Sequence, residues 1–205
     1  MLNKVNDLVI RGKARLITGA VAEALEDGCA PDEILSTMIA GMDVVGDRFK
    51  NGEIFVPEML IAAKAMKKGV EVLKPHLTSG AAGALGRVVI GTVAGDLHDI
   101  GKNLVAMMIE SAGFEVIDLG VDVPVEKFVA AALDDGVKIV ACSALLTTTM
   151  PALEATVAAL RAAGKDYKIM VGGAPITQDF ADKIGADAYT PDAATAARRA
   201  RELVA

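Results

Sequence analysis

The hydrophobic pattern of this chain changes its period once, and that change restricts the possible folds more than any other feature. Before residue 78, apolar residues recur every three or four positions, a spacing that places them on one face of a helix. After residue 86, short runs rich in valine and isoleucine alternate with helical stretches. The segment 78–86 reads TSGAAGALG, which is typical of a flexible connection between domains. We therefore expect two domains, residues 1–85 and residues 86–205.

The first domain is expected to be a four-helix bundle. Two of its helices are predicted to begin at Pro31 and Pro57, because proline suits the first turn and the acids that follow complement the helix dipole. The segment Lys50-Asn51-Gly52 separates these two helices. Four helical patterns without a strand-like run indicate a small bundle.

The second domain is expected to be an open, doubly wound α/β domain of the flavodoxin-like kind, with a five-stranded parallel sheet. Runs such as VVIGTV and KIVACS are continuously apolar, as strands buried on both faces of a sheet must be. Such sheets bind ligands at the carboxyl ends of their strands. The predicted strands are 87–93, 115–119, 138–143, 168–172 and 187–190, and the predicted helices are 101–112, 125–135, 150–163, 176–184 and 193–203.

Composition and charge exclude several classes of protein. Hydrophobic residues make up 53% of the chain, which is too many for a disordered protein, and the net charge of −6 disfavours a nucleic-acid partner. The longest stretch without Asp, Glu, Lys or Arg, residues 139–153, is shorter than the roughly 20 residues of a membrane-spanning helix. Cys29 and Cys142 fit no disulfide or metal spacing, so we expect a cytoplasmic protein without a membrane partner.

The loop after the first predicted strand reads GDLHDIGKN and carries the most informative residues. It matches neither a dinucleotide fingerprint nor a phosphate-binding loop, and Ser143 stands where a receiver domain would have its aspartate. Asp96 precedes His98 by two residues, and a metal-ligating imidazole usually has its second nitrogen held by a carboxylate. Because the only other histidine is His76, a bound cofactor would have to complete the coordination. The same residues also fit an ordinary loop with a solvated histidine.

These residues carry a resemblance to a known family. GDLHDIGKNLV resembles the D-x-H-x-x-G signature of cobalamin-binding proteins of the methionine synthase class, and Ser143-Ala144-Leu145 and Gly172-Gly173 resemble two further elements of that family. Gly46-Asp47-Arg48-Phe49 and Phe55-Val56-Pro57-Glu58-Met59 are similar to the helical cap that precedes the cobalamin domain. The whole chain resembles the corrinoid protein of multi-component methyltransferase systems, which serve methanol, methylamines or methoxylated aromatics.

The resemblance implies a cobalamin or related corrinoid cofactor and a role for particular residues. His98 would replace the nucleotide base as lower ligand to cobalt (base-off/His-on binding), Asp96 would accept its Nδ1 proton, and Thr149 would be the third member of this relay. The remaining residues expected to bind the cofactor surround these three in the sequence or lie at other strand ends and in the cap. They are Gly95, Leu97, Asp99, Ile100, Gly101, Ser143, Leu145, Thr147, Gly172, Gly173, Tyr189 and Asp192, together with Phe49, Val56 and Met59 of the cap.

The resemblance also implies a function and partners. The protein would carry a methyl group on cobalt from a substrate:corrinoid methyltransferase to a second methyltransferase with a folate or thiol acceptor, and a reductive activator would restore cobalt(I). As a carrier component it is not expected to turn over alone. The alternatives are a cobalamin-dependent sensor or regulatory protein that uses the same cap and pocket, and a cofactor-free α/β domain in which Asp96 and His98 are incidental.

Overall fold

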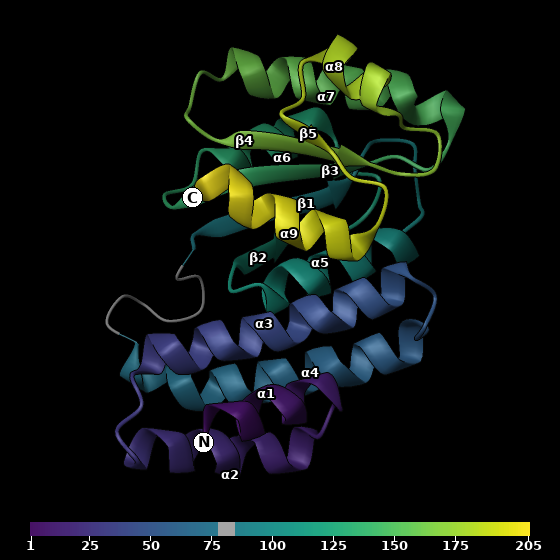
Figure 1. Cartoon of the computed structure of the whole chain (residues 1–205). Coiled ribbons are helices and arrows are strands. Elements are labelled where there is room, and N and C mark those ends of the chain that lie inside the picture. The colour runs from purple at the N-terminus through teal and green to yellow at the C-terminus, as the bar shows by residue number, and fades with distance from the viewer. Residues whose placement is uncertain (78–84) are drawn as a thin grey trace. The chain divides into compact units, whose positions relative to one another are not determined.

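The computed structural model describes residues 1–77 and 85–205 and divides the chain into two compact units. One unit is Met1–Ala84 with Ser111–Gly113, and the other is Leu85–Glu110 with Phe114–Ala205 (Figure 1). Most of the linker predicted at 78–86 lies outside the described residues. Residues 1–85 and 86–205 remain our proposed domains. None of the helices in the described part of the chain has the length and apolar character needed to cross a membrane.

The first unit contains the predicted four helices. They are α1 (Leu2–Ile10), α2 (Ala14–Glu26), α3 (Pro31–Lys50) and α4 (Val56–Leu73), followed by the short 3-10 helix η1 (Lys74–His76). As predicted, α3 begins at Pro31, with Asp32 and Glu33 in its first turn. Helix α4 begins one residue before Pro57, and the Glu58 carboxylate accepts a hydrogen bond of 3.0 Å from the Phe55 N–H. Fully buried side chains such as Ile17, Met38 and Met66 form the core of this unit.

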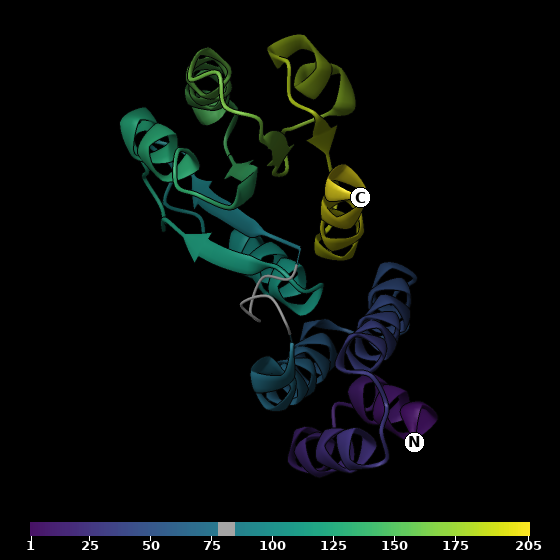
Figure 2. The ribbon, with the colours of Figure 1, turned by 90° about the vertical axis from the view of Figure 1, so that its left-hand side faces the viewer.

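The second unit is the predicted five-stranded, all-parallel sheet, in the order β2-β1-β3-β4-β5. Helices α6, α7 and α8 cover one face of the sheet, and α5 and α9 cover the other, so the doubly wound prediction is confirmed (Figure 2). The strands are β1 (Arg87–Thr92), β2 (Glu115–Asp118), β3 (Val137–Ser143), β4 (Lys168–Gly172) and β5 (Ala188–Tyr189). The helices are α5 (Ile100–Ser111), α6 (Val125–Ala132), α7 (Met150–Ala162), α8 (Gln178–Ile184) and α9 (Ala193–Val204).

Most elements lie within one residue of their predicted ends, and three differ more clearly. Helix α6 ends at Ala132 instead of residue 135. Helix α8 begins at Gln178 instead of residue 176, because the Thr177 side chain caps it by accepting a hydrogen bond from the Phe180 N–H. Ile176 therefore lies before the helix, where it is buried in the core. Strand β5 has only the two residues Ala188 and Tyr189, half the predicted length.

The core of the second unit fixes the position of the loops at the sheet's carboxyl edge. Phe128, Leu153 and Ile169 belong to a continuous buried cluster that joins the helices to the strands. Cys142 lies in the same cluster, and burial raises the pKa of its thiol. Because β1 pairs with β3 up to its last residue, the loops that follow these two strands leave the sheet side by side.

A buried lysine joins the start of α5 to the end of β2. The Lys102 Nζ donates hydrogen bonds of 2.5 Å to Asp118 Oδ2 and 2.7 Å to Asn103 Oδ1. The Lys102 side chain is 2% exposed, whereas that of Asp118 is 41% exposed. Removing the buried partner and removing the exposed partner should therefore have different effects.

We expect Asp118→Asn to be the more destabilising of the two substitutions. It leaves the Lys102 cation buried without its counter-charge, at a cost of about 2 kcal/mol in the free energy of unfolding. Lys102→Met removes the buried charge itself and leaves a carboxylate that water can solvate, so the expected cost is about 1 kcal/mol or less. Urea unfolding of both variants measures the difference, and equal losses or the reverse order would contradict the asymmetry.

Candidate functional site

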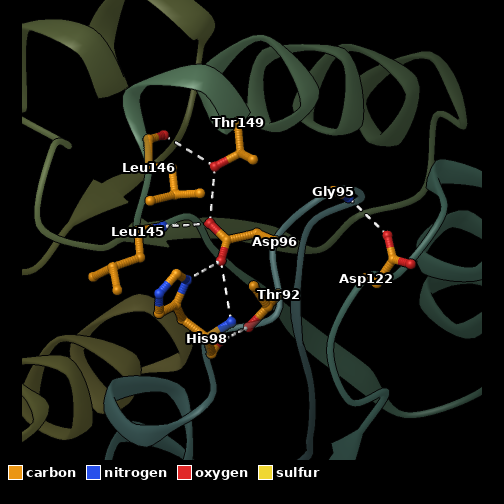
Figure 3. A network of polar contacts seen from close by, with 8 residues as sticks. All are labelled: Thr92, Gly95, Asp96, His98, Asp122, Leu145, Leu146 and Thr149. Atoms are coloured by element: carbon orange, nitrogen blue, oxygen red, sulfur yellow. Dashed lines mark hydrogen bonds and ion pairs between the residues drawn. The ribbon is translucent and has the colours of Figure 1, made fainter.

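The loop between β1 and α5 places the Asp96 carboxylate at the centre of a hydrogen-bond network (Figure 3). Asp96 is 0% exposed. Its Oδ1 accepts hydrogen bonds from the backbone N–H of His98, at 3.1 Å, and from the imidazole Nδ1 of the same residue, at 2.7 Å. Its Oδ2 accepts from the Leu145 N–H at 2.7 Å and from the Thr149 Oγ1 at 2.8 Å. Both oxygens of this buried carboxylate are thus fully used.

These four donors determine the charge of Asp96. Burial by itself raises the pKa of the carboxyl group, because it disfavours the charged form. The hydrogen bonds from Leu145, from the ring and backbone of His98, and from Thr149 outweigh this effect and hold the pKa well below its usual range. Asp96 is therefore an anion in the folded protein, and its neighbours are required to be donors.

The His98 ring is oriented from one side and open on the other. Because Asp96 is a carboxylate, the 2.7 Å contact assigns a proton to Nδ1, so that in the neutral form of the ring the lone pair is on Nε2. The Thr92 Oγ1 also donates to the His98 carbonyl at 2.8 Å, which fixes the backbone of the loop. The imidazole is 50% exposed. This arrangement orients the ring and leaves about half of it open to solvent.

Thr149 comes from the loop after β3, where it ends the 3-10 turn η2 (Thr147–Thr149). Its hydroxyl is buried, and it lies 3.0 Å from the Leu146 carbonyl as well as 2.8 Å from Asp96. The structure thus brings together the three residues predicted to form a relay. Thr149 and Asp96 are 53 positions apart in the sequence and meet because β1 and β3 are neighbours.

Within the described residues, 1–77 and 85–205, no three His, Cys, Asp or Glu side chains are grouped so as to hold a metal ion. A metal ligated by His98 would therefore have to take its other ligands from a bound cofactor, as expected from the sequence. Exposed apolar side chains stand on the same two loops and at the start of α5: Leu97 is 72% exposed, Ile100 78% and Leu145 39%. A metal carried in a large, mostly apolar ring system fits these residues.

The fold requires glycine at some of the predicted site positions and not at others. Gly173 has φ +129°, and a Cβ on it would lie 1.8 Å from the Ala144 carbonyl oxygen, so the loop after β4 requires glycine to pass the end of β3. Gly172 ends β4. At Gly101, in the first turn of α5, a Cβ would have no neighbour within 4 Å, and the fold does not require glycine there.

Other predicted residues lie at the same carboxyl edge without joining the Asp96 network through their side chains. Ser143 is the last residue of β3 and is half-buried, and Thr147 is exposed. Asp99 accepts a hydrogen bond from the Asn103 side chain at 3.1 Å. Tyr189 ends β5 and is half-buried, whereas the Asp192 carboxylate caps α9 by accepting from the Thr195 N–H at 2.7 Å.

The three predicted cap residues lie in the first unit in different surroundings. Phe49 and Val56 are half-buried, and Met59 is fully buried. Phe55, which directly precedes α4, is 69% exposed and was not among the predicted residues. The structure identifies Phe55 by the exposure of its large apolar side chain, whereas the hydrophobic period of the sequence does not show which apolar residues are exposed.

Asp122 is a second residue that the sequence pattern did not single out, although its loop was expected to lie at the ligand-binding edge. Its Oδ1 accepts a hydrogen bond of 2.7 Å from the Gly95 N–H, as Figure 3 shows. Its own N–H donates to the Asp96 carbonyl at 2.9 Å. The only sequence signal for this role is an aspartate after a glycine in a strand-end loop.

Comparison with protein families and known proteins agrees with these features over the full length of the chain. A family model described as a B12 binding domain matches residues 86–200, and a second with the same description matches residues 1–74. Dimethylamine corrinoid protein 3 of Methanosarcina acetivorans is 43% identical over 207 residues, which cover 100% of this chain and 97% of that protein. Trimethylamine corrinoid protein 1 of Methanosarcina mazei is 45% identical over 194 residues, covering 92% of this chain and 90% of that protein.

Solved structures give the same result. A cobalamin-binding protein from Desulfitobacterium hafniense DCB-2 superposes with a TM-score of 0.85 and 32% identity, covering 100% of this chain and 99% of that one. A chain of the methanol:cobalamin methyltransferase complex from Methanosarcina barkeri superposes with a TM-score of 0.82 and 30% identity. That match covers 98% of this chain and 78% of the other.

Proposed function

The chain belongs to the B12-binding family of corrinoid proteins, and we propose that it carries a methyl group between two methyltransferases with His98 as the lower ligand of its cofactor. The cofactor is cobalamin or a related corrinoid. The observation that supports the proposed ligation best is the Asp96–His98–Thr149 network, in which a buried anion holds Nδ1 and leaves Nε2 directed outward. When bound, the corrinoid supplies a cobalt centre that accepts a methyl group and releases it.

The residues of the network have separate tasks in this proposal. Asp96 retains the Nδ1 proton of His98, which raises the basicity of Nε2 toward a metal. The Thr149 hydroxyl donates a hydrogen bond to Asp96 Oδ2. This bond stabilises the carboxylate and so opposes transfer of the Nδ1 proton onto it.

The remaining predicted residues would shape the binding surface. The apolar side chains of Leu97, Ile100 and Leu145 would contact the corrin ring system, and Gly101 would allow it to approach the first turn of α5. Ser143, Thr147, Gly172, Gly173 and Tyr189 would line the slot for the displaced nucleotide. In the first unit, Phe49, Val56 and Met59 remain proposed cofactor-binding residues, and the exposed Phe55 is added to them.

The names of the similar proteins support the choice of partners. Two of them are dimethylamine and trimethylamine corrinoid proteins, and a structural neighbour comes from a methanol:cobalamin methyltransferase complex. We therefore propose a substrate:corrinoid methyltransferase for a methylated amine as the methyl-delivering partner. A second methyltransferase with a folate or thiol acceptor would remove the methyl group, and a reductive activator would restore cobalt(I).

Reconstitution with hydroxocobalamin tests the binding mode. We expect stoichiometric colour after desalting and a visible spectrum with an axial nitrogen ligand. His98→Ala should lose the spectral signature of that ligand and bind the cofactor at least about tenfold more weakly, because it removes a metal bond and its orienting network. His76→Ala is the matched control, since His76 is the only other histidine, and it should behave as the unmodified protein. A colourless protein, or an unchanged His98→Ala spectrum, would refute the proposed ligation.

Methyl transfer tests the carrier function separately. In the first arms, the cobalt(I) form is mixed with a methylamine:corrinoid methyltransferase and either trimethylamine or dimethylamine. In another arm, it is mixed with methanol and a methanol:corrinoid methyltransferase. We expect the bound corrinoid to become methylated in an amine arm, and visible spectroscopy monitors the change. Tight corrinoid binding without methylation in any arm would contradict the carrier function and favour a sensor.

A further inference from the structure

The loop that carries His98 is braced by a segment that contains none of the predicted site residues. We propose that Asp122, in the turn between β2 and α6, is a positioning residue that sets the geometry of the Asp96–His98 pair and thereby the strength of the His98 bond to the cofactor. The part of this inference that concerns the cofactor rests on the proposed function, whereas the part that concerns the pair does not.

Asp122 contacts the loop at two consecutive residues. Its carboxylate accepts the Gly95 N–H at 2.7 Å, and its backbone N–H donates to the Asp96 carbonyl at 2.9 Å. The Asp122 side chain thus binds the peptide just before Asp96, while its backbone binds Asp96 itself. Among the hydrogen bonds between described residues that Figure 3 shows, only the one from Gly95 to Asp122 joins this part of the loop to the segment after β2.

The backbone of Asp122 is held in a conformation that has a cost. Its φ is +49°, and it is the only residue other than glycine with positive φ in the described chain, residues 1–77 and 85–205. Side chains rarely adopt this left-handed region, although aspartate and asparagine tolerate it better than others. Such a conformation persists where surrounding contacts enforce it, and here those contacts are the two bonds to the His98 loop.

The same segment holds the other end of the loop. Asp118, at the end of β2, binds the buried Lys102 Nζ in the first turn of α5, four residues after His98. Asp118 Oδ1 also accepts the Gly120 N–H at 2.9 Å, and the Gly120 carbonyl accepts the Thr92 N–H at 3.0 Å. Residues 118–122 therefore secure the chain both before Asp96 and after His98.

This brace bears on the half-exposed ring of His98. The ring is oriented through its Nδ1 contact with Asp96, so a shift of the Asp96 backbone moves the acceptor on which the Nδ1–H tautomer depends. Within the described residues the imidazole bonds to Asp96, and Asp122 acts on it through Gly95 and Asp96. Loosening it should mix the two tautomers and weaken any bond that requires a lone pair on Nε2.

Three substitutions at Asp122 separate the possible causes. Asp122→Asn keeps the acceptor oxygen and tolerates positive φ, so it should resemble the unmodified protein. Asp122→Ala removes the acceptor and disfavours the left-handed backbone. Asp122→Gly removes the acceptor, but glycine adopts the left-handed backbone without strain. This variant therefore tests the loss of the acceptor if the alanine variant does not fold. Asp135→Ala, at an exposed carboxylate in the turn before β3, is the control for loss of a negative charge.

Two measurements on the cofactor-free protein decide the first part of the proposal. The Gly95 amide should exchange with solvent about tenfold faster or more in the alanine and glycine variants, because its hydrogen bond to a charged group is lost. Long-range ¹H–¹⁵N NMR of the imidazoles, with His76 identified by its own substitution, should show a single Nδ1–H tautomer for His98 in the unmodified, asparagine and Asp135→Ala proteins. The alanine and glycine variants should show a mixture.

The reconstituted protein decides the second part. Asp122→Ala and Asp122→Gly should lower the fraction of cofactor with an axial nitrogen ligand, whereas Asp122→Asn should restore it. An unchanged tautomer and unchanged Gly95 exchange in both the alanine and glycine variants would overturn the positioning role. If the unmodified protein itself shows no axial nitrogen ligand, the proposed ligation is wrong and the effect of Asp122 on the cofactor is wrong as well. The NMR and exchange results still test the positioning of Asp96 and His98 independently.

Discussion

Asp96→Ala is expected to lower the free energy of unfolding by about 3 kcal/mol or more, since it leaves buried donors without an acceptor at a cost of about 1–3 kcal/mol each. The groups that lose this acceptor are the Leu145 N–H and both the backbone N–H and the Nδ1–H of His98, whereas the Thr149 hydroxyl still has the Leu146 carbonyl. Corrinoid ligation by His98 should be lost with them. Asp96→Asn should be milder but still harmful, because the amide presents a donor where only acceptors fit.

The dependence of this effect on pH has a definite sign. The pKa of Asp96 is lowered in the folded protein, so its ionised form stabilises the fold at pH values above the unfolded pKa of about 3.9. That contribution is lost as the pH falls from about 4 toward the folded pKa. Urea unfolding at pH 7 and at successively lower pH should therefore show the gap between the unmodified protein and Asp96→Asn narrowing in acid. A gap that stays constant would show that the ionisation of Asp96 does not stabilise the fold.

Gly173→Ala is expected to be the most disruptive single methyl addition in the second unit, at about 3–5 kcal/mol. The new Cβ would lie 1.8 Å from the Ala144 carbonyl oxygen, and alanine disfavours the φ of +129° in any case. Because the obstacle is backbone, no side-chain rotation relieves it. Thermal or urea unfolding measures the loss, and a variant as stable as the unmodified protein would show that the two strand-end loops separate easily.

Two other glycines are matched controls for Gly173. Gly185→Ala meets the backbone penalty alone, at φ +77° in open space, and should cost about 1–2 kcal/mol. Gly101→Ala meets neither and should leave stability unchanged or raise it by up to about 1 kcal/mol. The same Gly101→Ala protein should bind hydroxocobalamin more weakly if the ring approaches α5 as proposed.

The fold was predictable because its signals are local. The change of hydrophobic period, the prolines at Pro31 and Pro57, and the continuously apolar strands each depend on a few neighbouring residues. The ends of elements were less predictable, as at Ile176, where the Thr177 cap and burial in the core outweigh helical spacing. The shortness of β5 likewise follows from how far its pairing with β4 extends, which no local pattern specifies.

The candidate site was predictable only in part. Asp96 and His98 were named because they match a family signature, and Thr149 because it keeps a hydroxyl where that family has a serine. The structure brings the three together. The Leu145 N–H contributes through its backbone, and Asp122 through both its carboxylate and its backbone N–H. Both positions depend on the pairing of β1 with its neighbours, which no local sequence pattern specifies. In the helical unit, spacing identifies an apolar face but does not tell a buried Met59 from an exposed Phe55.

The long sequence separation within the Asp96 network has a consequence for the order of events during synthesis. Asp96 is completed by Leu145 and Thr149, which follow it by 49 and 53 residues. Contacts of this kind form late in folding, because a long loop must close before they are made. The helices of residues 1–73 connect through short turns and are synthesised first. A nascent chain should therefore fold its N-terminal helices while still unable to capture a corrinoid, so that cofactor loading begins only after β3 has left the ribosome and paired with β1.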